Sequence, residues 1–443
     1  MRGDALPRVR GPVPGPRSRS LAERLSRVES RNVTARSQDG PVFWAEAAGA
    51  NVRDVDGNLY IDLTAGFGVA AAGHGNPRVA RAVATQFSRL AHAMGDVHPA
   101  DVKVELLERL ADLAPGDLRV SILSANGSDA VESALKTAVL ATGRPGVLAF
   151  RHGYHGLGYG SLAVTGIERF RAPFRRQLYG GVRFAPFPGE HDDPGAVLAA
   201  VREQVDAAAA GEHPVGVVVA EPILGRGGIV VPPPAFLPGL RSLCDELELV
   251  LVLDEVYTGL GRTGRWFACD HAGVVPDLLV LGKSLAGGLP VSAVVGTPAV
   301  MDAWPPSEGE ALHTSTFLGN PVTAAAALAH LREIEERGLV ARAEKLGTRL
   351  RRRLDGWVDR RAWAAGARGL GLMQALALTG PDPVRLGTAV MAEALRSGVI
   401  LLPEGDALAF TPPLVITERQ LDHALDTVER ILDALHPAGS RSQ

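Results

Sequence analysis

The feature that most restricts the fold is a series of short apolar runs separated by helical segments. These runs read VSIL at 120–123, GVLAF at 146–150, VGVVVAEP at 215–222, LVLVLDEV at 249–256 and DLLVLGK at 277–283. Strands with consecutive apolar residues are typically buried on both faces, beneath helices. The alternation therefore predicts an α/β domain with a mostly parallel sheet covered by helices, whose ligands bind at the carboxyl ends of the strands.

The chain on either side of this domain has a different pattern. With 443 residues it is longer than a single core usually allows, so we expect two domains. The flanking segments read as short strands within 42–63 with a turn at Asp56-Gly57, a long helix over 321–355, strands near 370–378, 399–402 and 408–410, and a helix near 417–436. We expect a large domain over residues 76–320 and a smaller α+β domain formed by 21–75 and 321–443.

The first 20 residues are rich in Arg, Pro and Gly and lack the apolar region of a secretory signal. They predict a disordered leader, with order beginning near Leu21, where LAERLSRVES reads as a short helix. An organelle-targeting peptide is disfavoured because the stretch has no amphipathic periodicity.

Composition excludes several classes of partner. The formal net charge of −3 implies no general attraction to nucleic acid or acidic membranes, and no apolar run is long enough to span a bilayer. The two cysteines, Cys244 and Cys269, have no CxxC spacing, which indicates a reducing compartment such as the cytoplasm and no zinc site.

Two polar residues follow buried-looking strands and point to chemistry. Asp254 ends LVLVLDEV, and Lys283 follows DLLVLG. Each alone is compatible with a solvated strand end. Together they place an acid and an amine at the same edge of the sheet. A deprotonated lysine can hold an aldehyde as an imine, and a carboxylate can keep a pyridine nitrogen protonated, which makes the ring an electron sink.

The surrounding sequence resembles a known family. DEVYTGLGRTGRWFA followed by PDLLVLGKSLAGGLP is similar to the class-III aminotransferases (ω-, ornithine and 4-aminobutyrate type), which have fold type I; the match runs from about Val42 to Thr417. The resemblance implies pyridoxal 5'-phosphate as cofactor, with Lys283 as its Schiff-base residue and Asp254 at the ring nitrogen. It implies ping-pong transfer of an amino group from an amine or amino acid to a 2-oxo acid.

The block ANGSDAVESALKTA resembles the family's phosphate-binding turn. Gly127 and Ser128 would open a helix whose first amide groups suit a phosphate dianion. An ordinary helix cap, with Ser128 four residues before Glu132, is the alternative from the residues alone.

Three further blocks would complete the cofactor site. The resemblance places Tyr154 of RHGYHGLGYG on one face of the ring, with His155 beside it, and Glu221 of AEPILGRGG near the phenolic edge and the substrate. Val256 is two residues beyond Asp254, on the same side of the strand, and would cover the other face, although plain core packing would also explain it. A Tyr-His pair in a glycine-rich loop could equally be surface.

The block HTSTFLGNP resembles the segment whose threonine, here Thr316, reaches the cofactor phosphate of a neighbouring subunit. This resemblance implies a homodimer or a larger homo-oligomer. A generic loop hydroxyl is the alternative.

The substrate side departs from the 4-aminobutyrate and ornithine members. Arg368 matches the family's carboxylate-binding arginine, a role that suits a guanidinium fork. Arg226 stands where those members have a glutamate, and Leu157 stands where they often have a second arginine. We therefore expect a less polar amine, or an amino acid held by Arg368 or Arg226, rather than 4-aminobutyrate or acetylornithine.

Two alternatives use the same machinery. An amino-acid racemase or epimerase, or an aminomutase, would need no 2-oxo acid, whereas an aminotransferase does. The glycine-rich segments GRTG at 261–264 and GRGG at 225–228 lack the spacing of dinucleotide or P-loop motifs.

Overall fold

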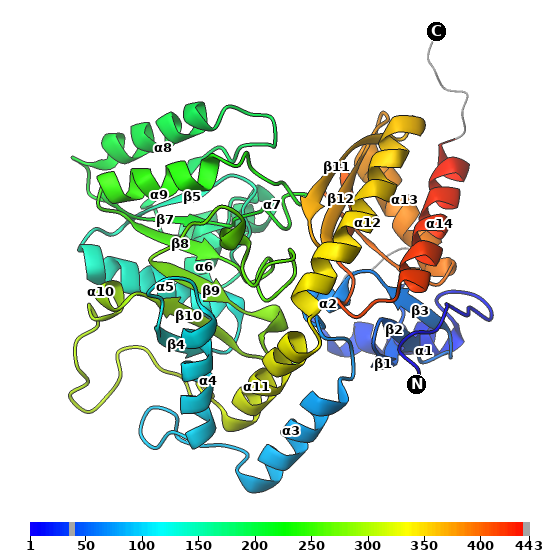
Figure 1. The fold of residues 1–443 in the computed structure, drawn as a ribbon, viewed down its shortest axis with the longest axis horizontal. Coiled ribbons are helices and arrows are strands. Elements are labelled where there is room, and N and C mark those ends of the chain that lie inside the picture. The colour runs from blue at the N-terminus through cyan, green and yellow to red at the C-terminus, as the bar shows by residue number, and fades with distance from the viewer. Residues whose placement is uncertain (35–39, 437–443) are drawn as a thin grey trace.

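The computed structural model describes residues 1–34 and 40–436, which form two domains side by side (Figure 1). The large domain is built on a seven-stranded sheet with the order β4-β10-β9-β8-β7-β5-β6. Its strands are β4 (Val120–Ser124), β5 (Gly146–Phe150), β6 (Val182–Ala185), β7 (Val215–Ala220), β8 (Val250–Asp254), β9 (Leu278–Leu281) and β10 (Ser292–Gly296). Only β10 runs against its neighbours among these strands, so the prediction of a mostly parallel sheet is confirmed.

Helices cover both faces of this sheet. Successive side chains of a strand point to opposite faces, so a strand of consecutive apolar residues buries side chains on both sides. Val250 and Val252 of β8 pack into the cluster that contains α5 (Gly127–Thr142). Leu251 and Leu253 pack into the main core with α8 (Pro194–Ala208) and α9 (Phe236–Glu246). The consecutive apolar residues of the strand are therefore explained by burial on two faces.

Shorter elements complete the large domain. The elements are α2 (Ala65–Gly68), α3 (Pro77–Arg89), α4 (Asp101–Leu113), α6 (Tyr159–Val164), α7 (Glu168–Arg171), α10 (Pro298–Met301) and the 3-10 turns η1 (Ala172–Gln177), η2 (Ala268–His271) and η3 (Lys283–Leu285).

The small domain joins the two ends of the chain. One sheet contains β1 (Trp44–Ala48), β2 (Asn51–Asp54), β3 (Leu59–Asp62) and β13 (Val399–Ile400), and the other contains β11 (Ala364–Leu370), β12 (Met373–Leu378), β15 (Ala407–Phe410) and β14 (Leu402–Glu404). Its C-terminal helices are α12 (Leu339–Arg360), α13 (Pro383–Arg396) and α14 (Glu418–Leu435). The parallel pairing of β13 with β3 brings N-terminal and C-terminal segments into one sheet.

The single long helix expected over 321–355 is two helices. α11 (Pro321–Glu336) and α12 are separated at Gly338, whose φ of 58° lies in the left-handed region that favours glycine. α11 packs on α3 and α4, whereas α12 packs on β11. We propose that the small domain begins at this break, 17 residues after the boundary expected at 321.

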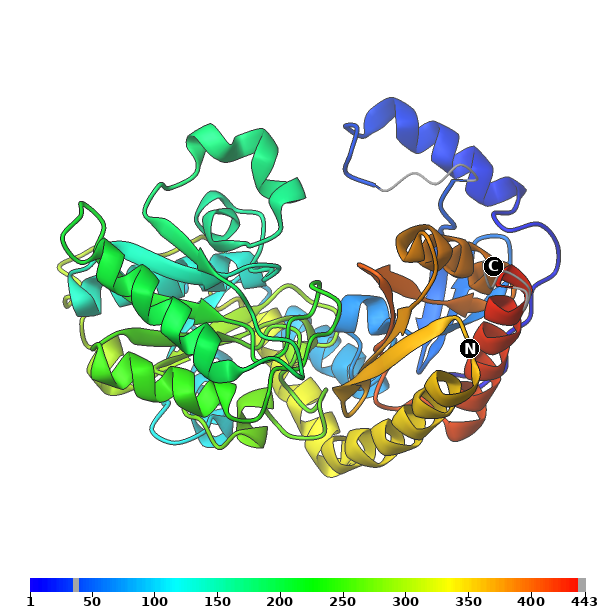
Figure 2. The same cartoon turned by 90° about the horizontal axis from the view of Figure 1, so that it is seen from above.

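The N-terminal leader differs from the disordered segment that its composition predicted. Arg8 and Leu59 exchange backbone hydrogen bonds of 2.9 and 3.0 Å. α1 (Pro16–Val28) begins five residues before Leu21, and the Asp56 carboxylate accepts hydrogen bonds from the Arg17 and Ser18 amides in its first turn. These partners lie far along the chain, so local composition could not reveal them. Figure 2 shows α1 extending away from the body of the small domain.

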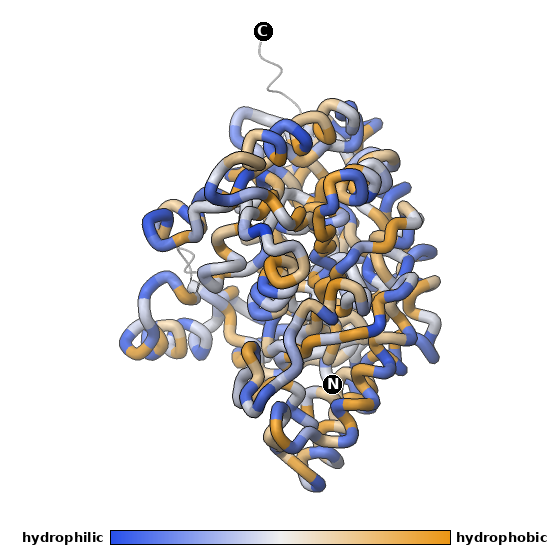
Figure 3. Tube along the Cα trace, turned by 90° about the vertical axis from the view of Figure 1, so that its left-hand side faces the viewer, coloured by the Kyte–Doolittle hydropathy of each residue, from blue (hydrophilic) through white to orange (hydrophobic). Residues whose placement is uncertain are grey.

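The surface helices are amphipathic, and hydrophobic and hydrophilic positions alternate around their turns (Figure 3). Within residues 1–34 and 40–436, none of the helices combines the length and apolarity needed to cross a membrane.

Asn51 offers a test of how the leader is attached. Its buried side-chain amide accepts from the Ala5 amide (2.9 Å) and the Gln420 side chain (3.1 Å), and donates to the Ala5 and Tyr60 carbonyls (3.1 and 2.9 Å). Asn51→Ala would leave several of these groups without partners, which costs about 2–4 kcal/mol. We expect the thermal unfolding midpoint to fall by several degrees. Glu105→Ala, at an exposed position on α4, is the control and should leave the midpoint unchanged.

Candidate active site

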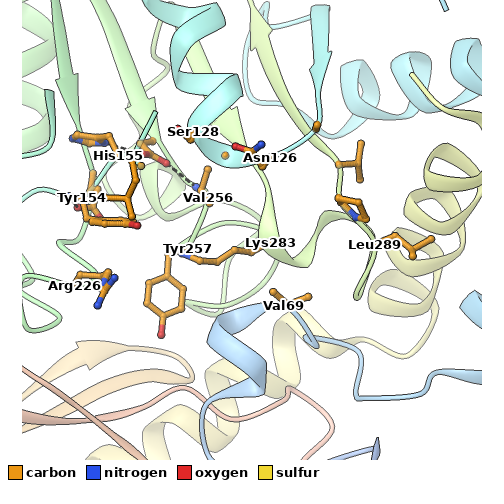
Figure 4. A pocket seen from close by; sticks show the side chains of 18 of the residues that line it. Val69, Asn126, Ser128, Tyr154, His155, Arg226, Val256, Tyr257, Lys283 and Leu289 are labelled. Carbon is orange, nitrogen blue, oxygen red and sulfur yellow. Dashed lines mark hydrogen bonds and ion pairs between the residues drawn. The ribbon is translucent and has the colours of Figure 1, made fainter. Parts of the chain in front are cut away.

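A cavity of about 570 Å³ opens where the carboxyl ends of β7, β8 and β9 meet, the position expected for a ligand in such a sheet. The structure brings together at this cavity all the site residues predicted from the sequence except Thr316 and Arg368 (Figure 4). They are Gly127, Ser128, Tyr154, His155, Glu221, Arg226, Asp254, Val256 and Lys283.

Asp254, the last residue of β8, presents a buried carboxylate to the cavity. One oxygen accepts a hydrogen bond from the Val256 amide (3.0 Å), and the other lies 2.8 Å from Nδ1 of His155. Burial alone would lower the pKa of His155, but the hydrogen bond and charge of Asp254, with the charge of Glu221, outweigh it and raise this pKa. His155 thus donates a hydrogen bond from Nδ1 to the Asp254 carboxylate and fixes its orientation.

Glu255, the next residue, has a structural role. It is buried on the other side of the strand end, where its carboxylate accepts hydrogen bonds from the Ala268 and Cys269 amides at 2.7 and 2.8 Å. Burial raises the pKa of Glu255 to about 7. Of the two neighbouring acids, only Asp254 lines the cavity.

Lys283 directly follows Gly282 at the end of β9 and has a φ of 41°, an uncommon value for a residue with a side chain. Its Nζ lies 4.0 Å from the centre of the Tyr257 ring. Burial lowers the pKa of Lys283 to about 8, although the negative charges of Asp254 and Glu221 oppose this shift. At pH 7 about a tenth of the amine is then neutral and available as a nucleophile or base, far more than for an ordinary lysine.

Glu221 lies just after β7 and fixes two loops of the site. Its carboxylate accepts hydrogen bonds from the Tyr154 amide and the Gly225 amide, both at 2.9 Å. Burial raises the pKa of Glu221 to about 7, and the nearby charge of Asp254 contributes in the same direction, whereas His155 opposes it.

The start of α5 provides the features of an anion site. Asn126, rather than Ser128, caps the helix by accepting from the Asp129 amide, which settles the capping alternative. Among the described residues, the amides of Gly127 and Ser128 have no hydrogen-bond partner. The Ser128 hydroxyl lies 2.5 Å from that of Ser161. Gly156 has a φ of 125° and lies so close that a methyl group there would come within 2.6 Å of Ser128.

Tyr154 and Val256 form two walls of the cavity. The Tyr154 ring makes an edge contact with Phe170, with the centroids 5.6 Å apart. A methyl group on Gly127 would come within 3.1 Å of Val256, so the start of α5 and the end of β8 are in close contact.

The two arginines predicted to bind substrate have different surroundings. Arg226 lines the cavity, with its guanidinium 4.9 Å from the Tyr154 ring centre and its Nε 3.9 Å from the Glu404 carboxylate. Arg368, on β11, is not among the lining residues. Its Nε donates to the Gly228 carbonyl (2.8 Å), and the terminal nitrogen lies 3.6 Å from Asp406.

Thr316 is exposed on the segment between α10 and α11, and it does not line the cavity of its own chain.

Tyr257, which lines the cavity, and Glu404, which acts on Lys283 from outside the cavity lining, were not predicted from the sequence. Tyr257 is part of the resembling block but was not assigned a role, and its position beside Lys283 depends on how the chain turns after β8. Glu404 comes from the small domain, and burial raises its pKa while Arg226 opposes the shift. No motif marks Glu404, because its proximity to the site depends on the packing of two domains.

These residues fit pyridoxal phosphate. The free amides of Gly127 and Ser128 suit a phosphate, the Asp254 carboxylate suits a pyridine nitrogen, and Lys283 is an amine with a lowered pKa. The Tyr154 and Val256 walls suit the faces of an aromatic ring. The cavity volume is in the range of small-molecule sites.

Comparison with known proteins finds related chains along almost the whole sequence. The model of the family described as aminotransferase class-III matches residues 33–432. The putrescine aminotransferase of Pectobacterium atrosepticum is 35% identical over 92% of this chain and 85% of that protein. The 4-aminobutyrate aminotransferase of Mycobacterium leprae is 36% identical over 95% and 96% of the respective chains. The alanine/serine racemase of Pyrococcus horikoshii is 32% identical over 96% and 92%.

The fold is shared with solved structures. An amine transaminase from an uncultivated Pseudomonas species, solved in its PLP-bound form, superposes with a TM-score of 0.85 at 29% identity, covering 92% of this chain and 98% of that chain.

The pKa of Lys283 predicts the pH dependence of cofactor capture. Only the neutral amine attacks an aldehyde, so the rate should rise through pH 8 and level off above it, whereas an ordinary lysine, with a pKa of 10.5, would still be gaining reactivity. Apoenzyme would be mixed with pyridoxal phosphate across this pH range and the visible absorbance of the lysine-bound form followed. Lys283→Arg should show no capture. A midpoint near 10 would contradict the desolvated environment.

Proposed function

The chain belongs to the class-III aminotransferases, and from that premise we propose that Lys283 and Asp254 carry the reaction in the cavity described above. The protein is a pyridoxal-phosphate-dependent aminotransferase that moves an amino group from an amine or amino acid to a 2-oxo acid. The observation that supports the proposed roles is the convergence of a buried carboxylate and an amine of lowered pKa on one cavity.

The bound cofactor supplies an aldehyde that accepts the amino group and a protonated ring that takes up negative charge. Asp254 holds the ring nitrogen protonated, and His155 holds the Asp254 carboxylate toward it. The amides of Gly127 and Ser128 would bind the phosphate at the start of α5. Tyr154 and Val256 would contact the two faces of the ring.

Lys283 is proposed to move the proton. Its neutral amine would remove a proton from the substrate carbon that bears the amino nitrogen, as a general base, and Nζ would then hold that proton as an ammonium group able to donate it again as a general acid. A pKa of about 8 suits both directions, because neither protonation state of Lys283 is strongly disfavoured near neutral pH.

We further propose that the active unit is at least a homodimer. Thr316 is exposed and lies outside the cavity of its own chain. A threonine at this position can donate a hydrogen bond to the cofactor phosphate of a second copy, as the family resemblance implies. This would explain why Thr316 does not line the cavity of its own chain.

The two arginines favour a donor without a distal carboxylate. Arg226 already faces Glu404, and Arg368 already binds Gly228 and Asp406, so a carboxylate would have to compete with these partners. The names of the relatives do not decide the point, since one is named for putrescine, which has no carboxylate, and another for 4-aminobutyrate, which has one. We propose a primary amine of low polarity as the preferred amine donor, with a 2-oxo acid as acceptor.

A racemase remains the second candidate, because the Pyrococcus horikoshii relative carries that name. The requirement for an acceptor separates the two functions, since racemisation consumes no 2-oxo acid.

Turnover tests the main proposal. With a primary amine and pyruvate, turnover should require both substrates. Double-reciprocal plots of initial rate against amine concentration, at several pyruvate concentrations, should give parallel lines, as for a ping-pong mechanism. Lys283→Ala should abolish turnover, and Asp254→Asn should lower kcat by at least about 100-fold, because a neutral amide cannot hold the ring nitrogen protonated. Glu105→Ala should behave as wild type. Turnover by Lys283→Ala, or inversion of an amino acid without any 2-oxo acid, would refute the proposal.

A half-reaction screen tests the donor class. The cofactor-loaded enzyme would be mixed separately with 1-phenylethylamine, putrescine, L-alanine and 4-aminobutyrate, and the loss of its visible absorbance timed. We expect the amines without a carboxylate to react at least about tenfold faster than 4-aminobutyrate, because the latter must displace Glu404 or Asp406 from an arginine. Faster reaction with 4-aminobutyrate would overturn this assignment.

A further inference from the structure

Tyr257 is held rigidly beside Lys283. Its ring lies between Gly68 and Gly225, where an added methyl group would come within 2.7 and 2.6 Å of ring atoms. Its hydroxyl donates to the Thr411 hydroxyl of the small domain at 3.1 Å. Two glycines from separate segments and one hydrogen bond therefore fix the plane of the ring.

The face of this ring is turned toward the lysine amine. Nζ of Lys283 lies 4.0 Å from the ring centre, within the range of a cation–π contact. Figure 4 shows the Lys283 side chain running toward Tyr257. Burial raises the pKa of the Tyr257 hydroxyl, so the ring is neutral in the working pH range and contributes through its π face rather than through a charge.

We propose that Tyr257 is a positioning residue of the transamination, whose ring face holds the protonated amine of Lys283 beside the cofactor site whenever that amine is not bonded to the cofactor. This inference rests on the role proposed for Lys283. The neutral Tyr257 ring stabilises the ammonium form of Lys283 without forming an ion pair with it, so the amine can move back to the cofactor.

The charged groups around Lys283 come from several elements. They are Asp254 at the end of β8, Glu221 after β7, Arg226 on the following loop and Glu404 on β14. Each of them also acts on Lys283, so a variant that tests the ring must leave these charges in place. Tyr257→Leu removes the ring face and Tyr257→Phe keeps it, and neither changes a charge.

The test is the pH dependence of pyridoxal phosphate capture by apoenzyme, measured for wild type, Tyr257→Phe and Tyr257→Leu. Without the ring the ammonium form is less stable, so the midpoint should fall by about one pH unit in Tyr257→Leu and stay unchanged in Tyr257→Phe. At pH 7 the Leu variant should then capture the cofactor several-fold faster than wild type. The cofactor's own ionisations are common to all the proteins and cancel in the comparison.

The other outcomes are distinct. Slower capture by Tyr257→Leu at every pH with an unchanged midpoint means that the ring only fills space, which overturns the inference. A shift in Tyr257→Phe equal to that in Tyr257→Leu assigns the effect to the hydroxyl and also overturns it. Should the Leu variant not fold, Tyr257→Met, which fills similar volume without a π face, takes its place. Capture that persists in Lys283→Arg would refute the proposed role of Lys283 itself, separately from that of Tyr257.

Discussion

The site depends on a buried carboxylate that has to be held in one orientation. Asp254 ends a strand that is apolar on both faces, and a carboxylate in such surroundings needs partners. His155 and the Val256 amide provide them, and together they aim Asp254 into the cavity. The buried surroundings that require the Asp254 carboxylate to have hydrogen-bond partners also lower the pKa of Lys283. Burial therefore shapes both of the groups that the chemistry needs.

Much of this could be predicted from the sequence because the relevant signals are local. The apolar runs predicted β4, β5, β7, β8 and β9. Glu221, Asp254 and Lys283 follow or end three of these strands, so their meeting at one edge of the sheet could also be predicted. β6 and β10 were not predicted, because VRFA of β6 includes an arginine and SAVVG of β10 follows a glycine-rich segment.

The errors at the N-terminal leader and at the substrate side share one physical cause, which is contact between segments distant in sequence. The leader is ordered by Leu59, Asn51 and Asp56, none of which is near it along the chain. The contact between Arg226 and Glu404 spans the two domains, and so does the bond from Tyr257 to Thr411. The family resemblance placed Arg226 on the substrate side, but only the packed domains show which acid lies opposite it.

The central claim is a covalent link between Lys283 and the cofactor, and chemical trapping tests it most directly. The enzyme loaded with pyridoxal phosphate would be reduced with borohydride, digested and mapped by mass spectrometry. The account predicts a single modified peptide, carrying the reduced cofactor on Lys283. A cofactor mass on another lysine, or on none, would contradict it.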